Sequence, residues 1–218
     1  MKPFAKMPRR WVLNHGLKLF KWQGEDKATH IAALMAYIAI VQRAKDGKVV
    51  LTLDSLAKAI YASRQKVHDG TELLHGYGLV IKQAGLGRSG SLYSLVDTEG
   101  TWQKLPALTV TEKGKVMFFK DFHLRKKSEL NALKLYLLLI TFRDNTDNST
   151  KIAYDRITDY TGIARNEIKS AIDILIHHNF IRLESQASLN WDDMKMNVYR
   201  IRGVDTSLHR GTVGRKAK

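Results

Sequence analysis

The stretch SRQKVHDGTELLHGYGLVIKQAGLGRSGSLYSLV occupies residues 63–96 and joins a helical pattern to a β-hairpin pattern. Ser63 is a residue type that caps helix N-termini, and apolar positions recur after it at helical spacing. The inward face of this helix is predicted to comprise Val67, Thr71 and Leu74. Residues 79–81 and 91–96 are β-like runs on either side of the glycine-rich turn 85–90. The stretch therefore predicts a helix followed by an antiparallel hairpin.

Two further helices and a short strand are predicted upstream. Residues 31–41 carry apolar side chains at i, i+3, i+4, i+7 and i+10, which form one face of a helix. Residues 49–51 are a β-like run, and residues 53–60 form a shorter amphipathic helix with Thr52 as its N-cap. The predicted order is helix, strand, helix, helix and hairpin.

This order recurs later in the chain. Lys6-Met7-Pro8 aligns with Lys104-Leu105-Pro106 at an offset of 98, and the apolar positions of the helices align at offsets of 99 and 101. In the second copy we expect helices at 130–140, 157–160 and 168–175, a strand at 151–153, and hairpin strands at 180–183 and 194–202. The repeat predicts two domains, residues 1–100 and 101–203, followed by a flexible basic tail at 204–218.

The chain is strongly basic. Its 218 residues include 36 Lys and Arg against 21 Asp and Glu, which gives a net charge of +15. A domain this basic usually binds a polyanion, nucleic acid before an anionic membrane surface, and a generically basic surface is the alternative. Hydrophobic residues make up 44% of the chain, which is enough for a packed core.

Several functions are disfavoured by what the sequence lacks. The chain has no Cys, so it predicts no disulfide, thiol nucleophile or Cys-ligated zinc. Its apolar runs fall short of the ~20 residues that a membrane span needs, and its N-terminal segment has no apolar signal-peptide core. Residues 85–90 match a dinucleotide fingerprint by letter, but a β-like run follows where a helix is required. We therefore expect a cytoplasmic, nucleoid-associated protein with no catalytic residues, metal, cofactor or membrane partner.

The order helix, strand, helix, helix and hairpin in residues 27–97 and 128–203 resembles the winged-helix family, a helix-turn-helix variant whose β-hairpin forms a wing. The resemblance rests on element order and apolar spacing. Two such units in tandem are similar to bacterial transcription regulators and to plasmid and phage replication initiators. The expected fold class is mainly α with small β-hairpins (α+β), arranged as two tandem winged-helix domains.

The resemblance implies that the third helix of each unit enters a major groove and that the wings contact the neighbouring backbone. The first turns of both helices carry Arg together with Gln or Asn, which pair with guanine and adenine edges. The expected DNA-binding residues are Ser63, Arg64, Gln65, Lys66 and His68 in the first unit, Arg165, Asn166, Lys169 and Ser170 in the second, and Arg88, Ser89, Arg200 and Arg202 on the wings. An ordinary solvated helix surface is the alternative for these residue types.

Aromatic residues alternate with basic ones ahead of the first helix of each unit. They are Phe4, Trp11, Phe20, Trp22, Trp102, Phe118, Phe119 and Phe122. Aromatic side chains beside cations suit base stacking on a single strand, and core packing is the commoner role of such residues. The pattern leaves both interpretations open.

The sequence thus predicts a sequence-specific double-stranded DNA-binding protein, a transcriptional regulator that acts by occupying its target. A plasmid or phage replication initiator that binds origin repeats is the alternative, and a protein-interaction scaffold or an RNA-binding module are further ones. The expected partners are double-stranded DNA, a second copy of the chain on repeated sites, and host replication or transcription machinery.

Overall fold

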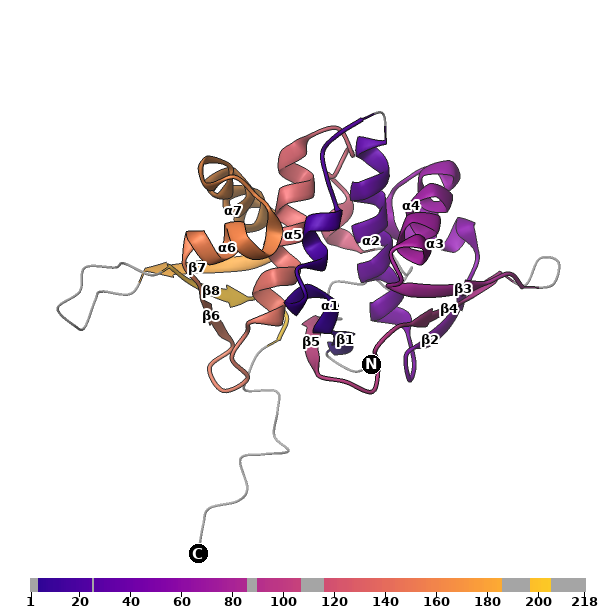
Figure 1. The fold of residues 1–218 in the computed structure, drawn as a ribbon, viewed down its shortest axis with the longest axis horizontal. Coiled ribbons are helices and arrows are strands. Elements are labelled where there is room, and N and C mark those ends of the chain that lie inside the picture. The colour runs from indigo at the N-terminus through magenta and orange to yellow at the C-terminus, as the bar shows by residue number, and fades with distance from the viewer. Residues whose placement is uncertain (1–3, 25, 86–89, 107–115, 186–196, 205–218) are drawn as a thin grey trace, which may run out of the picture.

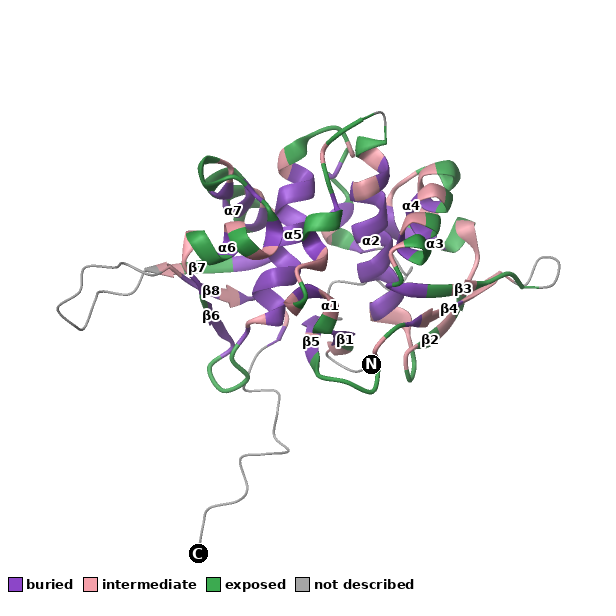
Figure 2. Ribbon diagram, viewed as in Figure 1, coloured by how far each residue is buried: buried purple, intermediate pink, exposed green. Residues whose placement is uncertain are grey.

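The structure, a computed structural model, describes residues 4–24, 26–85, 90–106, 116–185 and 197–204. At its centre two long helices, α2 (Lys27–Arg43) and α5 (Lys127–Thr141), lie side by side and run in the same direction (Figure 1). All residues from 31 to 41 of α2 are buried, although their spacing predicted a single inward face (Figure 2). The difference arises because α5 covers the side of α2 that a lone domain would leave in water.

The first unit, residues 27–96, continues after α2 with a strand, two helices and a hairpin. Its elements are β2 (Lys48–Leu51), α3 (Leu53–Ile60), α4 (Arg64–Gly76), β3 (Val80–Gln83) and β4 (Ser91–Leu95). The strands form an antiparallel sheet in the order β2-β4-β3, and α4 packs along α2. Both predicted caps are confirmed: Thr52 Oγ1 accepts from the N–H of Ser55, and Ser63 Oγ accepts from the N–H of Lys66.

The second unit, residues 127–204, repeats this order after α5. Its elements are β6 (Ser149–Lys151), α6 (Tyr154–Thr161), the 3-10 turn η3 (Arg165–Glu167), α7 (Ile168–His177), β7 (Ile181–Ser185) and β8 (Asn197–Ile201). The strand order β6-β8-β7 matches that of the first sheet, so the chain is mixed α+β as expected.

One strand of the second unit was misplaced by the sequence pattern. We expected it at 151–153, and the structure places it at Ser149–Lys151. Thr150 is the reason: its side chain is buried and donates to the carbonyl of Leu139, while its backbone pairs with Tyr199. The polar, turn-like composition around Thr150 is therefore the reason why the sequence pattern did not indicate a strand there.

Each unit is preceded by a leading segment, and the two leading segments pair with each other. The first (residues 4–24) contains β1 (Phe4–Pro8), α1 (Arg10–Leu13) and η1 (Gly16–Leu19), and the second (residues 102–106 and 116–122) contains β5 (Trp102–Pro106) and η2 (Met117–Phe119). The antiparallel ladder between β1 and β5 pairs Lys6 with Lys104, Ala5 with Leu105 and Met7 with Gln103. At the offset of 98, Met7 corresponds to Leu105 and Ala5 to Gln103. The pairing is therefore two-fold symmetric about Lys6 and Lys104.

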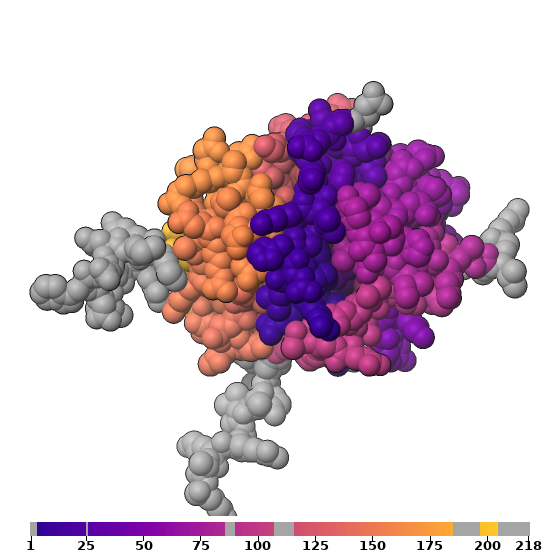
Figure 3. All heavy atoms as spheres, in the orientation of Figure 1, coloured from indigo at the N-terminus to yellow at the C-terminus, as the bar shows by residue number. Residues whose placement is uncertain are grey.

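The leading segments also cross over to the opposite unit. His15 Nδ1 lies 3.1 Å from the carbonyl oxygen of Asp159 in α6, and the N–H of Val116 donates to the carbonyl of Ala59 in α3 at 2.9 Å. Figure 3 shows the first leading segment as an indigo band between the orange second unit and the magenta first unit. These reciprocal contacts join the two units across an approximate local two-fold axis.

The predicted domain boundary between residues 100 and 101 falls in the turn from β4 to β5. The boundary stays a prediction. Because the leading segments cross, each unit is partly covered by the leading segment of the other. Val204, which the prediction assigned to the flexible tail, is buried at 3% exposure. The rest of the predicted tail, residues 205–218, lies outside the described residues.

Candidate nucleic-acid interface

The first turn of α4 carries the predicted residues of the first unit on its outer side. The residues predicted to face inward are buried: Val67, Thr71 and Leu74. Of the predicted DNA-binding residues, Ser63, Arg64, Gln65 and His68 are exposed and Lys66 is half-buried. This arrangement follows from packing, because the apolar stripe of α4 lies against α2 and turns the polar side of the first turn toward solvent.

Acidic neighbours hold three of these side chains in place. Arg64 Nε lies 3.2 Å from Asp54 Oδ1, in the first turn of α3. Gln65 donates to Asp69 Oδ1 at 2.7 Å, and His68 Nδ1 lies 3.5 Å from the same oxygen. Exposed pairs of this kind contribute at most about 1 kcal/mol, so a nucleic acid can replace them at small cost.

The second unit presents a matching first turn across η3 and the start of α7. Arg165 forms an ion pair with Asp155 in the first turn of α6, and its guanidinium lies 5.8 Å from the ring centroid of Tyr154. Lys169 pairs with Asp173 at 3.0 Å. The other predicted residues of this helix, Asn166 and Ser170, are exposed.

The arginine–aspartate pair is repeated between the units, which the sequence analysis did not foresee. Arg64 and Arg165 are 101 residues apart, and so are Asp54 and Asp155. The equal offset of the two aspartates was the available signal. Each pair joins the N-terminal turns of two consecutive helical segments, where the positive end of the helix dipole favours negative charge such as that of the aspartate.

The structure describes two of the four residues that were predicted to contact DNA from the wings. Arg88 and Ser89 lie outside the described residues. Arg200 occupies the central strand β8, where its Nε donates to both carboxylate oxygens of Glu184 at 2.8 Å and its Nη1 donates to the carbonyl of Asp147. A DNA contact by Arg200 would have to replace these bonds. Arg202 follows β8 and is exposed.

A basic band connects the two first turns. Helices α2 and α5 begin side by side at the top of Figure 1, between α4 and α7. The exposed cations at and before these helix starts are Lys21, Lys27, Arg125, Lys126 and Lys127. Lys127 is paired with Glu167 of η3 at 2.7 Å, and the other cations add positive charge at this end of the two helices.

Most of the interleaved aromatic residues serve the core. Trp11 packs edge-to-face on Tyr37 at 5.2 Å between ring centroids and donates to its hydroxyl at 2.8 Å. Phe20 and Phe119 are fully buried, and Phe122 is 3% exposed. Phe4 and Trp102 differ, because they stack on each other on the outer side of the β1–β5 ladder.

Comparison with known proteins supplies no family: no protein-family model matches the chain, and no curated protein matches it. Among the described helices, none is both long and apolar enough to span a bilayer. Within the same residues, no cluster of three or more His, Asp and Glu side chains could hold a metal ion.

Proposed function

We propose that the chain is a sequence-specific double-stranded DNA-binding protein built from two winged-helix units, and that it regulates transcription by occupying its target. One observation carries the proposal: both units expose the first turn of the third helix with an arginine held by an aspartate of the preceding helix. Arginine recognises guanine edges with two parallel hydrogen bonds, and Gln65 and Asn166 are residue types that recognise adenine. The basic band between the two turns supplies charge for the intervening phosphates.

The two-fold relation of the leading segments favours an inverted target. The ladder between β1 and β5 and the reciprocal crossing contacts relate the units by an approximate two-fold axis rather than by a translation. Helices α4 and α7 would then approach the duplex in opposite senses. The expected target is a pseudo-palindrome whose half-site centres are about one helical turn (~34 Å) apart.

The first test is selection from a duplex pool with a randomised centre of about 30 base pairs, roughly three helical turns. We expect an enriched inverted motif. Arg64→Ala should relax base preference at one position in one half-site, and Arg165→Ala should do so in the other half-site. Each loss should amount to about 1–3 kcal/mol, which is the discrimination of a good bidentate contact.

Lys48→Ala is the matched control, because Lys48 is an exposed cation on β2, away from α4 and α7. It should leave the base preference unchanged. If an arginine variant weakened binding to all sequences equally, that arginine would be a phosphate clamp and not a base reader. Affinity that did not fall by ~10³ or more between about 50 and 200 mM salt would contradict the proposal and favour a protein scaffold.

A further inference from the structure

The outer side of the β1–β5 ladder is a small polar and aromatic surface. Strand alternation places Met7 and Leu105 in the core, where both are fully buried. The opposite side carries six side chains, of which Pro8 and Pro106 are buried. The other four are Phe4, Lys6, Trp102 and Lys104. We call this set the ribbon face.

The ribbon face alternates cations with aromatic rings. Phe4 and Trp102 stack with ring centroids 6.2 Å apart and an interplanar angle of 11°. Lys6 Nζ lies 4.9 Å from the Trp102 ring centroid, and Lys104 Nζ lies 5.0 Å from that of Phe4. The two rings thus form a short stacking surface with an ammonium group at each end.

Both charged side chains of the ribbon face are lysines. Lys6 and Lys104 are direct partners in the antiparallel ladder, and their ammonium groups lie over different rings. Burial lowers the pKa of Lys104, and the nearby cation Arg143 lowers it further. None of the six side chains on this side of the ladder is acidic, so the ribbon face favours a negatively charged ligand.

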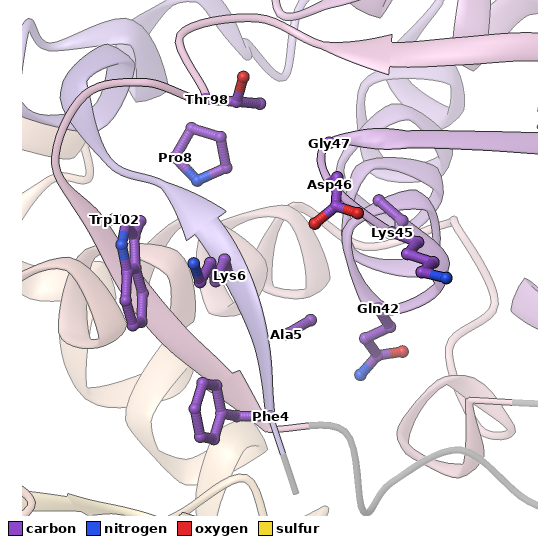
Figure 4. Close-up of a pocket in the computed structure, with 11 residues that line it drawn as sticks. Phe4, Ala5, Lys6, Pro8, Gln42, Lys45, Asp46, Gly47, Thr98 and Trp102 are labelled. Carbon is purple, nitrogen blue, oxygen red and sulfur yellow. The ribbon is translucent and has the colours of Figure 1, made fainter. Parts of the chain in front are cut away.

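A cavity of about 730 Å³ opens beside the ribbon face. Figure 4 shows Phe4 and Trp102 on one side of β1, and Lys45 and Asp46 on the other. This volume falls within the range of small-ligand pockets, so a nucleobase fits inside it. The carboxylate of Asp46 adds a hydrogen-bond acceptor at the edge of this cavity, where an N–H group of a base could donate to it.

We propose that the ribbon face binds an unpaired nucleic-acid strand, with bases stacked on Trp102 and Phe4 and phosphates bound by Lys6 and Lys104. Aromatic rings beside cations are the usual means of holding single strands without reading their sequence. The ribbon face lies at the bottom of Figure 1, whereas α2 and α5 begin at the top, so this site is separate from the proposed duplex interface. A second copy of the chain is a poorer occupant, because two identical ribbon faces would bring lysine against lysine.

The test measures fluorescence anisotropy of a labelled oligothymidylate of about 20 nucleotides, long enough to cover a typical single-strand site. Trp102→Ala should weaken its binding at least about 5-fold, the lower end of the cost of losing one stacked base. Trp102→Phe should restore most of the affinity, since it keeps a ring for stacking. Circular dichroism and thermal melting show whether Trp102→Ala retains its fold, and Trp102→Phe keeps the comparison informative if it does not.

The lysines are tested through salt dependence. Replacing both Lys6 and Lys104 by Ala should reduce the slope of log affinity against log salt by about 1.4, because each phosphate contact on a single strand contributes ~0.7. The control replaces Lys58 and Lys151, two exposed lysines on α3 and β6, and should leave the slope nearly unchanged.

Two results would overturn the inference. The first is unchanged oligothymidylate affinity in Trp102→Ala; if the sedimentation of this variant also changed, the face would be assigned to self-association. The second is an equal loss in both lysine pairs, which would indicate diffuse attraction to a basic protein. Duplex selection with the Arg64 and Arg165 variants is independent of these outcomes, so failure of either proposal can be recognised separately.

Discussion

At the scale of single residues, Lys134 stands out as a cation inside the molecule. Its side chain lies in α5 and is 5% exposed, and its Nζ donates to the carbonyl oxygen of Phe20 in the first leading segment at 3.0 Å. The pKa of Lys134 is lowered to about 8, first by burial and then by the nearby Lys127, while Glu167 opposes the shift. The corresponding residue of the first unit, at the offset of 99, is the buried Met35. The two units therefore differ at this corresponding position, which holds a buried cation in the second unit and an apolar side chain in the first.

Lys134 should make stability rise with pH. Its folded pKa is depressed, so between about pH 8 and its unfolded value near 10.4 the unfolded chain binds more protons than the folded one. The burial cost is fully present below pH 8 and is relieved as pH rises. Relative to Lys134→Met, the wild-type protein should gain about 2 kcal/mol of unfolding free energy between about pH 7 and 10, measured by urea denaturation.

His30 does not contribute to the change in unfolding free energy over this pH range. It faces the same region, and burial lowers its pKa from 6.5, so it stays neutral across the alkaline range. Lys58→Met, which alters an exposed lysine on α3, is the control and should track the wild-type curve. Parallel curves for the wild-type protein and Lys134→Met would show that Lys134 titrates normally.

At the scale of elements, the approach of α4 to α2 depends on a glycine. A Cβ atom added at Gly70 would lie 2.8 Å from the backbone nitrogen of Ala33 and 3.0 Å from the carbonyl carbon of Ala32. These are backbone atoms of α2, so the two helices would have to separate. The corresponding residue in α7, at the offset of 101, is Ala171, which is buried.

Gly70→Ala should therefore destabilise the protein, although alanine favours helices. Overpacking at a helix contact costs about 1–3 kcal/mol and outweighs the gain of up to about 1 kcal/mol in helix propensity. Gly76→Ala is the matched control in the same helix, because no atom lies within 4 Å of an added Cβ there. It should be neutral or slightly stabilising in chemical denaturation. Equal effects of the two substitutions would contradict the close-approach argument.

Local signals were sufficient to predict most of these elements. Thr52 and Ser63 identified two helix starts, and the apolar spacing of Val67 and Leu74 identified the buried side of α4. The partner of Arg64 was visible only through the equal offset of Asp54 and Asp155. The partner of Arg200 could not be read from the sequence, because the register of the β7–β8 hairpin brings Glu184 beside it.

At the scale of the whole molecule, the crossed leading segments should make the two units unfold together. Met7 lies on β1, is fully buried, and belongs to the same core as both units. Met7→Ala should cost about 2–5 kcal/mol, as a large-to-small change in a core does. Denaturation followed by fluorescence and by circular dichroism should still give one coincident transition. Two separate transitions in the wild-type protein would show that the units are independent.

The repeat of the two leading segments was visible in the sequence, but the way in which they pair was not. The match between Lys6-Met7-Pro8 and Lys104-Leu105-Pro106 was visible, yet a repeat says nothing about whether its copies pair. Pairing of β1 with β5 is a contact across nearly 100 residues, and only the packed molecule defines it. For the same reason the ribbon face could not be predicted, although Phe4 and Trp102 were among the eight aromatic residues for which base stacking and core packing were both left open.

The covalent link between the two units has a consequence for orientation. A dimer of identical chains on an inverted repeat looks the same from either end of its site. Here the halves are joined in tandem and differ in sequence: Lys134 corresponds to Met35, and the 3-10 turn η3 precedes α7, whereas no such turn precedes α4. A chain bound to DNA as proposed would therefore present different units to the two sides of its site. Its effect on transcription could then be limited to the gene on one side.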